Sequence, residues 1–237
     1  MSEVLKVVDL QAFYGRAQIL FGVNLSLSKG EIVTLIGRNG VGKTTLLKAI
    51  MNIELSKKGK VLLNGVDITG LPTNVIASKG IAYMPDYAGL IPGVSVVDNL
   101  RLAAGRKNID LSKASEIYPE IKNLLERRAD SLSGGEKKIV GLLRFLYMNP
   151  SVILVDEPTE GVSPIVARKI YDMLTTMKKT GLTVFLVEQG TRYNMLTGIA
   201  DRFLVMVGGK IVLESTPQTI HKERDLIKKY LAVGGET

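Results

Sequence analysis

Residues 37–45 read GRNGVGKTT, a spacing of glycine, lysine and threonine that is typical of a phosphate-binding loop. Glycines let the backbone wrap around a phosphate so that consecutive amides point inward, and the helix that follows begins with free N–H groups. In this pattern Lys43 can reach the β- and γ-phosphates of a nucleotide, and the Thr44 hydroxyl can bind Mg²⁺. The sequence therefore predicts a nucleotide site built from Gly37, Asn39, Gly40, Gly42, Lys43, Thr44 and Thr45.

Two carboxylates, Asp156 and Glu157, follow the apolar run VILV. Ligands of parallel sheets bind beyond the carboxyl ends of the strands. We expect Asp156 to hold the Mg²⁺ shell through water, and Glu157 to orient or deprotonate an attacking water. Two solvated carboxylates at a strand end are common in isolation, but a Mg²⁺–phosphate site needs a carboxylate in this place.

A second stretch that can bind an anion is LSGGE at residues 132–136, directly before the helical run KKIVGLLRFLYM. Ser133, Gly134 and Gly135 can form a helix N-terminus with free amides. The alternative is an ordinary helix cap followed by flexible glycines. Because the phosphate loop already binds one side of a nucleotide, a second helix N-terminus of this kind suggests contact with the nucleotide of a second chain.

Gln189 ends the apolar run GLTVFLVEQ. An amide cannot titrate, but its NH₂ can donate to a γ-phosphate oxygen and its carbonyl can accept a hydrogen bond. The alternative is a glutamine at a strand end that caps the next helix. The single histidine, His221, lies in a predicted C-terminal helix and is a poor candidate for the site. We therefore expect Gln189 to sense the γ-phosphate without acid–base chemistry.

The elements that position these residues alternate between strands and helices, which indicates an α/β fold with a parallel sheet covered on both faces. Residues 4–28 loosely alternate in polarity and predict two antiparallel strands. Further strands are predicted at residues 31–37, 59–68, 81–85, 151–157 and 182–188, a Gly-Gly hairpin at 202–214, and helices at 43–51, 164–179 and 217–231.

Residues 95–149 have helical spacing and few clustered strand formers. We expect a helical subdomain, bounded at residues 87–149, that is inserted into the sheet. The length of 237 residues suits one large domain, so residues 1–237 are predicted to form a single unit.

Composition narrows the classes of function. The chain has no cysteine and one histidine, which argues against disulfides, thiolate metal sites and a histidine-based zinc site. The net charge of +8 comes from scattered basic pairs without a run of five, so we expect no nucleic-acid partner. The charge fits either solubility or attraction to an anionic membrane face. We read no signal peptide and no apolar run of ~20 residues, and expect a soluble, cytoplasmic protein.

The order of these motifs resembles that of ATP-binding cassette (ABC) ATPases almost from end to end. The resemblance covers Tyr14, the phosphate loop, the segment from about residue 85 to 92, LSGGE, VILVDE, the turn PTEGVSP and VEQG. It implies a P-loop ATPase core with an N-terminal antiparallel β subdomain and the inserted helical subdomain. It also implies head-to-tail pairing, with each ATP between one chain's phosphate loop and residues 133–135 of the other. Tyr14 would then stack on adenine, unless it is only a tyrosine at a strand edge.

The finer resemblance is to the ATPase subunits of branched-chain amino-acid importers, and within them to the subunit with glutamine at the usual histidine position. It rests on LSGGE, VDEPTEGVSP, FLVEQG and the tail KKYLAVGG. It implies membrane permease subunits, a second ATPase chain of the same or another kind, and indirectly a solute-binding protein as partners. The protein would lie on the inner face of the cell membrane.

Three positions depart from the general cassette pattern. Asp86 stands where the family usually has glutamine; it is shorter and adds negative charge, but can still approach Mg²⁺ or its water. Its alternative role is to form its own loop turn. Ser163 stands where the family often has aspartate, and Gln189 replaces histidine.

These departures leave open a module that binds ATP and dimerises but hydrolyses weakly, although the retained Glu157 argues against it. A DNA-linked cassette ATPase would need long heptads or a basic stripe, and the sequence has neither.

Overall fold

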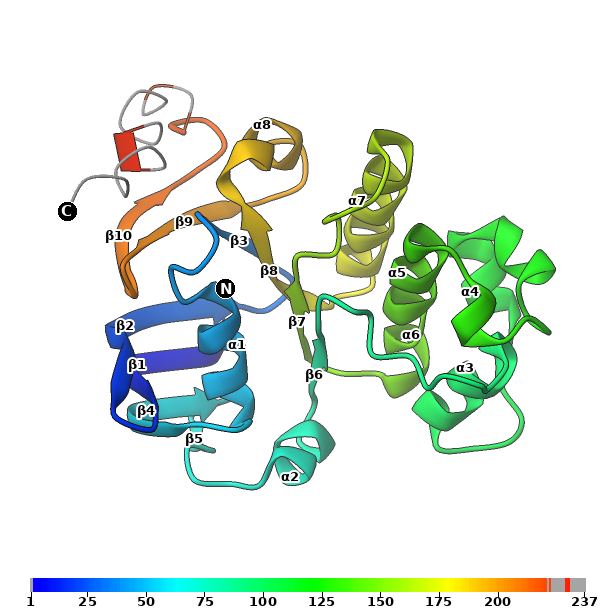
Figure 1. Ribbon diagram of the computed structural model, residues 1–237, viewed down its shortest axis with the longest axis horizontal. Helices are drawn as coiled ribbons and strands as arrows, with labels where there is room; N and C mark the ends of the chain where they lie inside the picture. The colour runs from blue at the N-terminus through cyan, green and yellow to red at the C-terminus, as the bar shows by residue number, and fades with distance from the viewer. Residues whose placement is uncertain (1, 221, 223–228, 231–237) are drawn as a thin grey trace.

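The computed structural model describes residues 2–220, 222 and 229–230, and is built around two β-sheets (Figure 1). One is a four-stranded antiparallel sheet with the order β2-β1-β4-β5. The other has six strands in the order β10-β9-β3-β8-β7-β6, and is parallel except for the β9–β10 pair. The α/β class and the P-loop core with a mixed sheet are therefore confirmed.

The six-stranded sheet positions the site residues that the sequence predicts at the carboxyl ends of its strands. Its central strands β3, β7 and β8 are buried along nearly their whole length because both faces are covered. Gly37 of β3 pairs with Gln189 of β8, and Asp156 of β7 pairs with Val187. The strands are β3 (Ile32–Gly37), β6 (Ile81–Met84), β7 (Val152–Asp156), β8 (Thr183–Gln189), β9 (Arg202–Val207) and β10 (Lys210–Ser215).

The antiparallel sheet holds the two strands expected within residues 4–28. Helix α1 (Lys43–Met51) lies between the two sheets, where Leu46, Leu47 and Ile50 are fully buried in a core shared with both. Its strands are β1 (Glu3–Tyr14), β2 (Ala17–Ser28), β4 (Ser56–Leu63) and β5 (Val66–Asp67).

Helices fill the chain between β6 and β7 and gather at the side of the molecule away from the antiparallel sheet (Figure 1). The helical spacing expected over residues 95–149 is interrupted at several places. Pro119 lacks the N–H that would continue α4, and residues 124–128 are not helical. The run after LSGGE divides at Arg144. The elements are α3 (Val96–Ala104), α4 (Ser112–Ile117), η1 (Pro119–Asn123), η2 (Ala129–Ser131), α5 (Gly134–Leu143) and α6 (Phe145–Met148).

The remaining helices are α2 (Thr73–Ser78), α7 (Pro164–Lys179), η3 (Gly190–Arg192) and α8 (Tyr193–Leu196). Helix α7 has the bounds that the sequence predicts, whereas α2 was not expected. The helix expected at 217–231 is wrong at its start, because residues 217–220 form a turn. Most of that segment, including His221, lies outside the described residues. None of the helices in the described part of the chain combines the length and apolar character that a bilayer crossing needs.

The β9–β10 hairpin turns at Gly208 and Gly209, which both have positive φ as the Gly-Gly pattern predicts. Its tip contacts the phosphate loop and the antiparallel sheet. The Gly209 N–H donates to the Val41 carbonyl at 2.9 Å, and the Gly209 carbonyl accepts from the Phe21 N–H at 3.1 Å. A side chain at Gly209 would collide with the Ile19 carbonyl oxygen.

Candidate functional site

A cavity of about 330 Å³ opens at the carboxyl edge of the six-stranded sheet, over the start of α1. It brings together the phosphate loop, Asp86 and the two carboxylates after β7. Its lining consists of Ile19, Asn39, Gly40, Gly42, Lys43, Thr44, Thr45, Asp86, Asp156, Glu157 and Glu160.

The phosphate loop needs its glycines. A Cβ at Gly37 would lie 2.7 Å from the Met206 carbonyl oxygen, so the close approach of β9 excludes a side chain there. Gly40 and Gly42 have φ of +79° and +108°, which L side chains rarely adopt. Gly42 directly precedes α1, so the loop ends at the positive pole of that helix. The fold therefore has the local geometry of an anion-binding loop.

Lys43 is almost completely buried within this loop. Its Nζ donates to the carbonyls of Gly37 at 3.1 Å and Arg38 at 2.9 Å, and lies 3.0 Å from Glu157 Oε1. The Lys43 side chain is 3% exposed and that of Glu157 is 12% exposed. A cation and a carboxylate thus face each other at the point where the loop meets β7.

Asp156 is held by two hydroxyl groups. Thr44 Oγ1 donates to Asp156 Oδ1 at 3.1 Å, and the Tyr83 hydroxyl donates to Oδ2 at 3.2 Å. Burial, followed by the nearby negative charges of Glu157 and Asp86, raises the pKa of Asp156 to about 6 against these two hydrogen bonds. Tyr83 was not anticipated, since nothing in its sequence context marks it.

The pair of Thr44 and Asp156 fits Mg²⁺. A hydroxyl and a desolvated carboxylate in contact supply the hard oxygen ligands that this ion prefers, and Mg²⁺ usually takes few protein ligands beside phosphates and waters. No cluster of three or more acidic, histidine or cysteine residues suitable for a metal occurs within the described residues. Asp86 lines the same cavity, and its Oδ1 accepts from the Tyr87 N–H at 2.8 Å, so it also forms the loop turn considered as its alternative role.

Gln189 points toward the carboxylates beyond β7. Its Nε2 donates to Glu160 Oε1 at 3.1 Å and to Glu157 Oε2 at a longer 3.5 Å. In the part of the chain that the structure describes, the Gln189 side chain forms no hydrogen bond to η3 or α8, which disfavours the capping alternative. Glu160 is a second residue that the sequence analysis missed, although it lies in the turn PTEGVSP.

A buried polar cluster lies directly behind Gln189. Glu188 is fully buried, and its Oε1 accepts from Thr159 Oγ1 at 2.6 Å and from the Tyr171 hydroxyl at 3.2 Å. Its Oε2 accepts from the Gln189 N–H at 3.3 Å. Burial raises the pKa of Glu188. The cluster ties β8 to the turn after β7 and to helix α7.

Ser133 caps helix α5 and does not line the cavity in its own chain. Its Oγ accepts from the Glu136 N–H at 3.3 Å, and Glu136 Oε2 accepts from the Ser133 N–H at 2.7 Å, which is a complete capping box. Gly134 borders open space, whereas a Cβ at Gly135 would lie 3.0 Å from Val166 of α7. The helix cap is thus present, and contact with a second chain's nucleotide stays a prediction.

Tyr14 lies at the end of β1, is 40% exposed and does not line the cavity. Its predicted role as an adenine platform stays a prediction.

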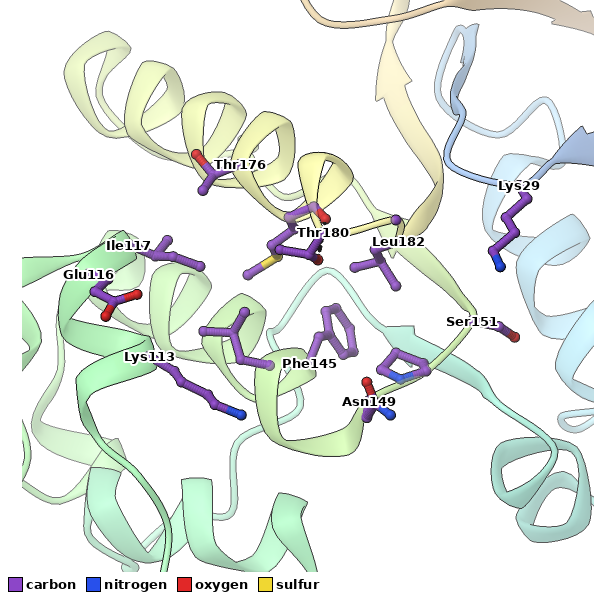
Figure 2. A pocket seen from close by; sticks show the side chains of 14 residues that line it. Lys29, Lys113, Glu116, Ile117, Phe145, Asn149, Ser151, Thr176, Thr180 and Leu182 are labelled. Carbon is purple, nitrogen blue, oxygen red and sulfur yellow. Dashed lines mark hydrogen bonds between the residues drawn. The ribbon is translucent and has the colours of Figure 1, made fainter. Parts of the chain in front are cut away.

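A larger cavity, about 640 Å³, lies at the opposite edge of the sheet, between α4, α6, the end of α7 and Lys29 (Figure 2). Lys29, Ser151 and Leu182 at its rim precede the starts of β3, β7 and β8. None of the predicted site residues lines it. We place the functional site in the smaller cavity, because the buried lysine, the carboxylates and the glycine loop converge there.

A phosphate loop between β3 and α1, with Asp156 and Glu157 after β7, a parallel strand separated from β3 by β8, defines a P-loop nucleoside triphosphatase. Residues 20–160 match the sequence model of the family described as ABC transporter, which is more than half of the chain. The chain therefore belongs to the ABC transporter ATPase family. It is an ATPase that uses ATP with Mg²⁺.

Three relatives show the range of this similarity. The chain is 34% identical over 212 residues to the high-affinity branched-chain amino acid transport ATP-binding protein BraG of Pseudomonas aeruginosa, covering 87% of this chain and 90% of the relative. It is 33% identical over 229 residues to the lipopolysaccharide export system ATP-binding protein LptB of Escherichia coli K12, covering 93% of each. The solved structure of MJ1267, an ATP-binding cassette of an ABC transporter, superposes with a TM-score of 0.81 at 26% identity. That superposition covers 99% of this chain and 100% of MJ1267.

Proposed function

We propose that this ABC transporter ATPase powers the import of branched-chain amino acids, with ATP closing a head-to-tail pair of cassettes and hydrolysis reopening it. The observation that carries the hydrolytic part is the contact of the Glu157 carboxylate, which lines the cavity, with both the Lys43 ammonium and the Gln189 amide. These three groups can bind the γ-phosphate, position a water and accept its proton.

The residues divide the reaction among them. Lys43 exchanges its ion pair with Glu157 for the β- and γ-phosphates, which frees the carboxylate to orient and deprotonate the attacking water. Gln189 holds a γ-phosphate oxygen through its amide, with no proton transfer. Thr44 and Asp156 would hold Mg²⁺, and Asp86, which lines the same cavity, would approach the ion or its water. When bound, Mg²⁺ neutralises charge that develops on the transferred phosphoryl group.

Residues 133–135 of each chain complete the site of the other, since the α5 N-terminus lies outside its own cavity and Gly134 borders open space. The second cassette is a copy of this chain or a related ATPase. Membrane permease subunits hold the pair at the inner face of the cell membrane, and a solute-binding protein delivers the substrate to them. The helices at residues 87–149 form the subdomain that moves against the sheet.

The choice of substrate is supported by the similarity to BraG and by the motifs VDEPTEGVSP and FLVEQG. Similarity to LptB at almost the same identity makes lipopolysaccharide export the competing assignment. The test is uptake of labelled leucine, isoleucine and valine by source cells that lack the gene, complemented with the wild type or with Glu157→Gln. We expect uptake only with the wild type. Normal uptake in the deletion strain, with defective lipopolysaccharide export, would refute the importer.

The hydrolytic site is tested separately on the purified full chain. We expect Glu157→Gln to bind ATP while its steady-state ATPase rate falls by about a hundredfold or more, as for loss of a general base. Equal rates for wild type and variant would remove Glu157 from the mechanism and favour a module that binds ATP and hydrolyses it weakly.

A further inference from the structure

Lys138 is a buried lysine in the middle of helix α5. Its residue surface is 8% exposed, although lysine is rarely buried without a partner. Its Nζ donates to the backbone carbonyl of Glu157 at 2.9 Å, nineteen positions along the chain. The lysine thus contacts the peptide group of the residue proposed as the general base.

The charges around Lys138 explain why an ammonium is tolerated there. Burial lowers the pKa of Lys138, while the nearby carboxylates of Asp86, Glu160, Glu188 and Asp156 oppose the shift, in that order of strength. These four groups come from three separate segments of the chain. Lys138 is therefore a cation on α5 that faces the acidic residues of the nucleotide site.

The backbone of Glu157 has an unusual conformation that needs support. Its φ is +40°, in the left-handed region that residues with side chains seldom adopt. Its N–H donates to the Val187 carbonyl at 3.0 Å, and its carbonyl accepts from Lys138 Nζ at 2.9 Å and from the Glu160 N–H at 3.1 Å. The backbone N–H and C=O of Glu157 are therefore both hydrogen-bonded. These bonds fix the direction of the Glu157 side chain relative to β8 and to α5.

Helix α5 also carries residues 133–135 at its start. Lys138 follows Ser133 by five positions, which corresponds to about 7.5 Å along a helix axis. A helical segment of this length moves as one body, so a displacement of the Ser133 end is transmitted to the Lys138 ammonium and from there to the Glu157 peptide.

We propose that Lys138 is a positioning residue for ATP hydrolysis, which holds the left-handed turn at Glu157 and links it to the α5 N-terminus that faces the partner's nucleotide. This inference rests on the proposed function, in that it takes Glu157 as the base. Lys138 itself does not line the nucleotide cavity. Loss of its ammonium leaves Glu157 present but incorrectly directed.

The test compares Lys138→Met with Lys137→Met in the full chain. Methionine keeps much of the length of the side chain and removes the charge. Lys137 is the neighbour on the same helix, is partly exposed, and its side chain forms no hydrogen bond or ion pair with the described residues. Its variant carries the same change in net charge. The measurements are kcat and KM for ATP hydrolysis, the ATP dissociation constant without Mg²⁺, and the thermal unfolding midpoint. Lys138→Leu serves as a second variant if Lys138→Met does not fold.

We expect kcat of Lys138→Met to fall about tenfold or more, as for loss of a hydrogen bond from a charged donor, with the ATP dissociation constant within about twofold of wild type. Lys137→Met keeps the wild-type kcat. Equal kcat in the two variants would overturn the proposal, as would a fall in kcat matched by lower ATP affinity and a lower unfolding midpoint. Glu157→Gln in the same assay separates the positioning role of Lys138 from the general-base role of Glu157. If it abolishes turnover while Lys138→Met does not lower kcat, only the positioning role fails.

Discussion

Removing the Thr159 hydroxyl is expected to destabilise the fold measurably, although the change is a single small group. Thr159 Oγ1 donates at 2.6 Å to Glu188, and both residues are fully buried. Valine has nearly the same shape, so Thr159→Val removes the donor with little change in packing. The Glu188 carboxylate then keeps the Tyr171 hydroxyl as its remaining side-chain donor in the cluster.

The size of the effect follows from the charge of the acceptor. A hydrogen bond to a charged group contributes about 1.5–3 kcal/mol, and loss of one partner leaves the buried acceptor underpaired. For a chain of this length each kcal/mol lowers the unfolding midpoint by about 2–4 °C. We therefore expect Thr159→Val to unfold about 3–12 °C below the wild type.

The assay is urea and thermal unfolding at pH 8. Thr176→Val is the matched control, because Thr176 is exposed and its Oγ1 donates only to the Asp172 carbonyl one turn earlier in α7. We expect the control to stay within about 0.5 kcal/mol of wild type. If the two variants were equally stable, the Thr159–Glu188 bond would contribute nothing, and the cluster would not secure the turn after β7.

Three further outcomes are expected. Gln189→Ala binds ATP but turns over slowly, measured by equilibrium binding and steady-state ATPase; a normal rate would make VEQG only a strand end. Glu188→Gln gains stability relative to wild type as the pH rises, measured by unfolding from pH 4 to 9. The reason is that burial raises the pKa of Glu188, so the stability linked to its protonated form is lost as pH rises through the folded-state pKa. The third concerns Asp156, whose pKa of about 6 predicts that kcat/KM falls as pH drops through 6 at low Mg²⁺, and that saturating Mg²⁺ moves this step to lower pH. If the pH at which kcat/KM falls did not change with Mg²⁺ concentration, the titration would belong to another group.

The sequence located the phosphate loop and the carboxylates after β7 because strand, turn and helix signals are local. Glycine spacing and an apolar run predict where the backbone bends and which strand end is reached, and the parallel order of β3, β7 and β8 then brings Lys43, Asp156 and Gln189 to one edge.

The contacts that support these residues could not be predicted in the same way. Tyr83 reaches Asp156 from a neighbouring strand, and Lys138 reaches Glu157 from helix α5. Such contacts depend on side-chain direction and on the packing of elements far apart in sequence, which hydrophobic periodicity does not encode. The helix prediction around Pro119 failed for a local reason. The polarity pattern is helical throughout this run, but Pro119 interrupts the helix.

The glycine hairpin between β9 and β10 has a consequence for engineering the protein. Tips of hairpins are usually permissive places for insertions and tags. Here the tip packs between the Val41 carbonyl of the phosphate loop and residues 19–21 of β2. A peptide tag inserted after Gly208 would therefore disturb the contact with Val41 and change the conformation of the phosphate loop. A labelling strategy should avoid this turn, even though it looks like an ordinary exposed loop in the sequence.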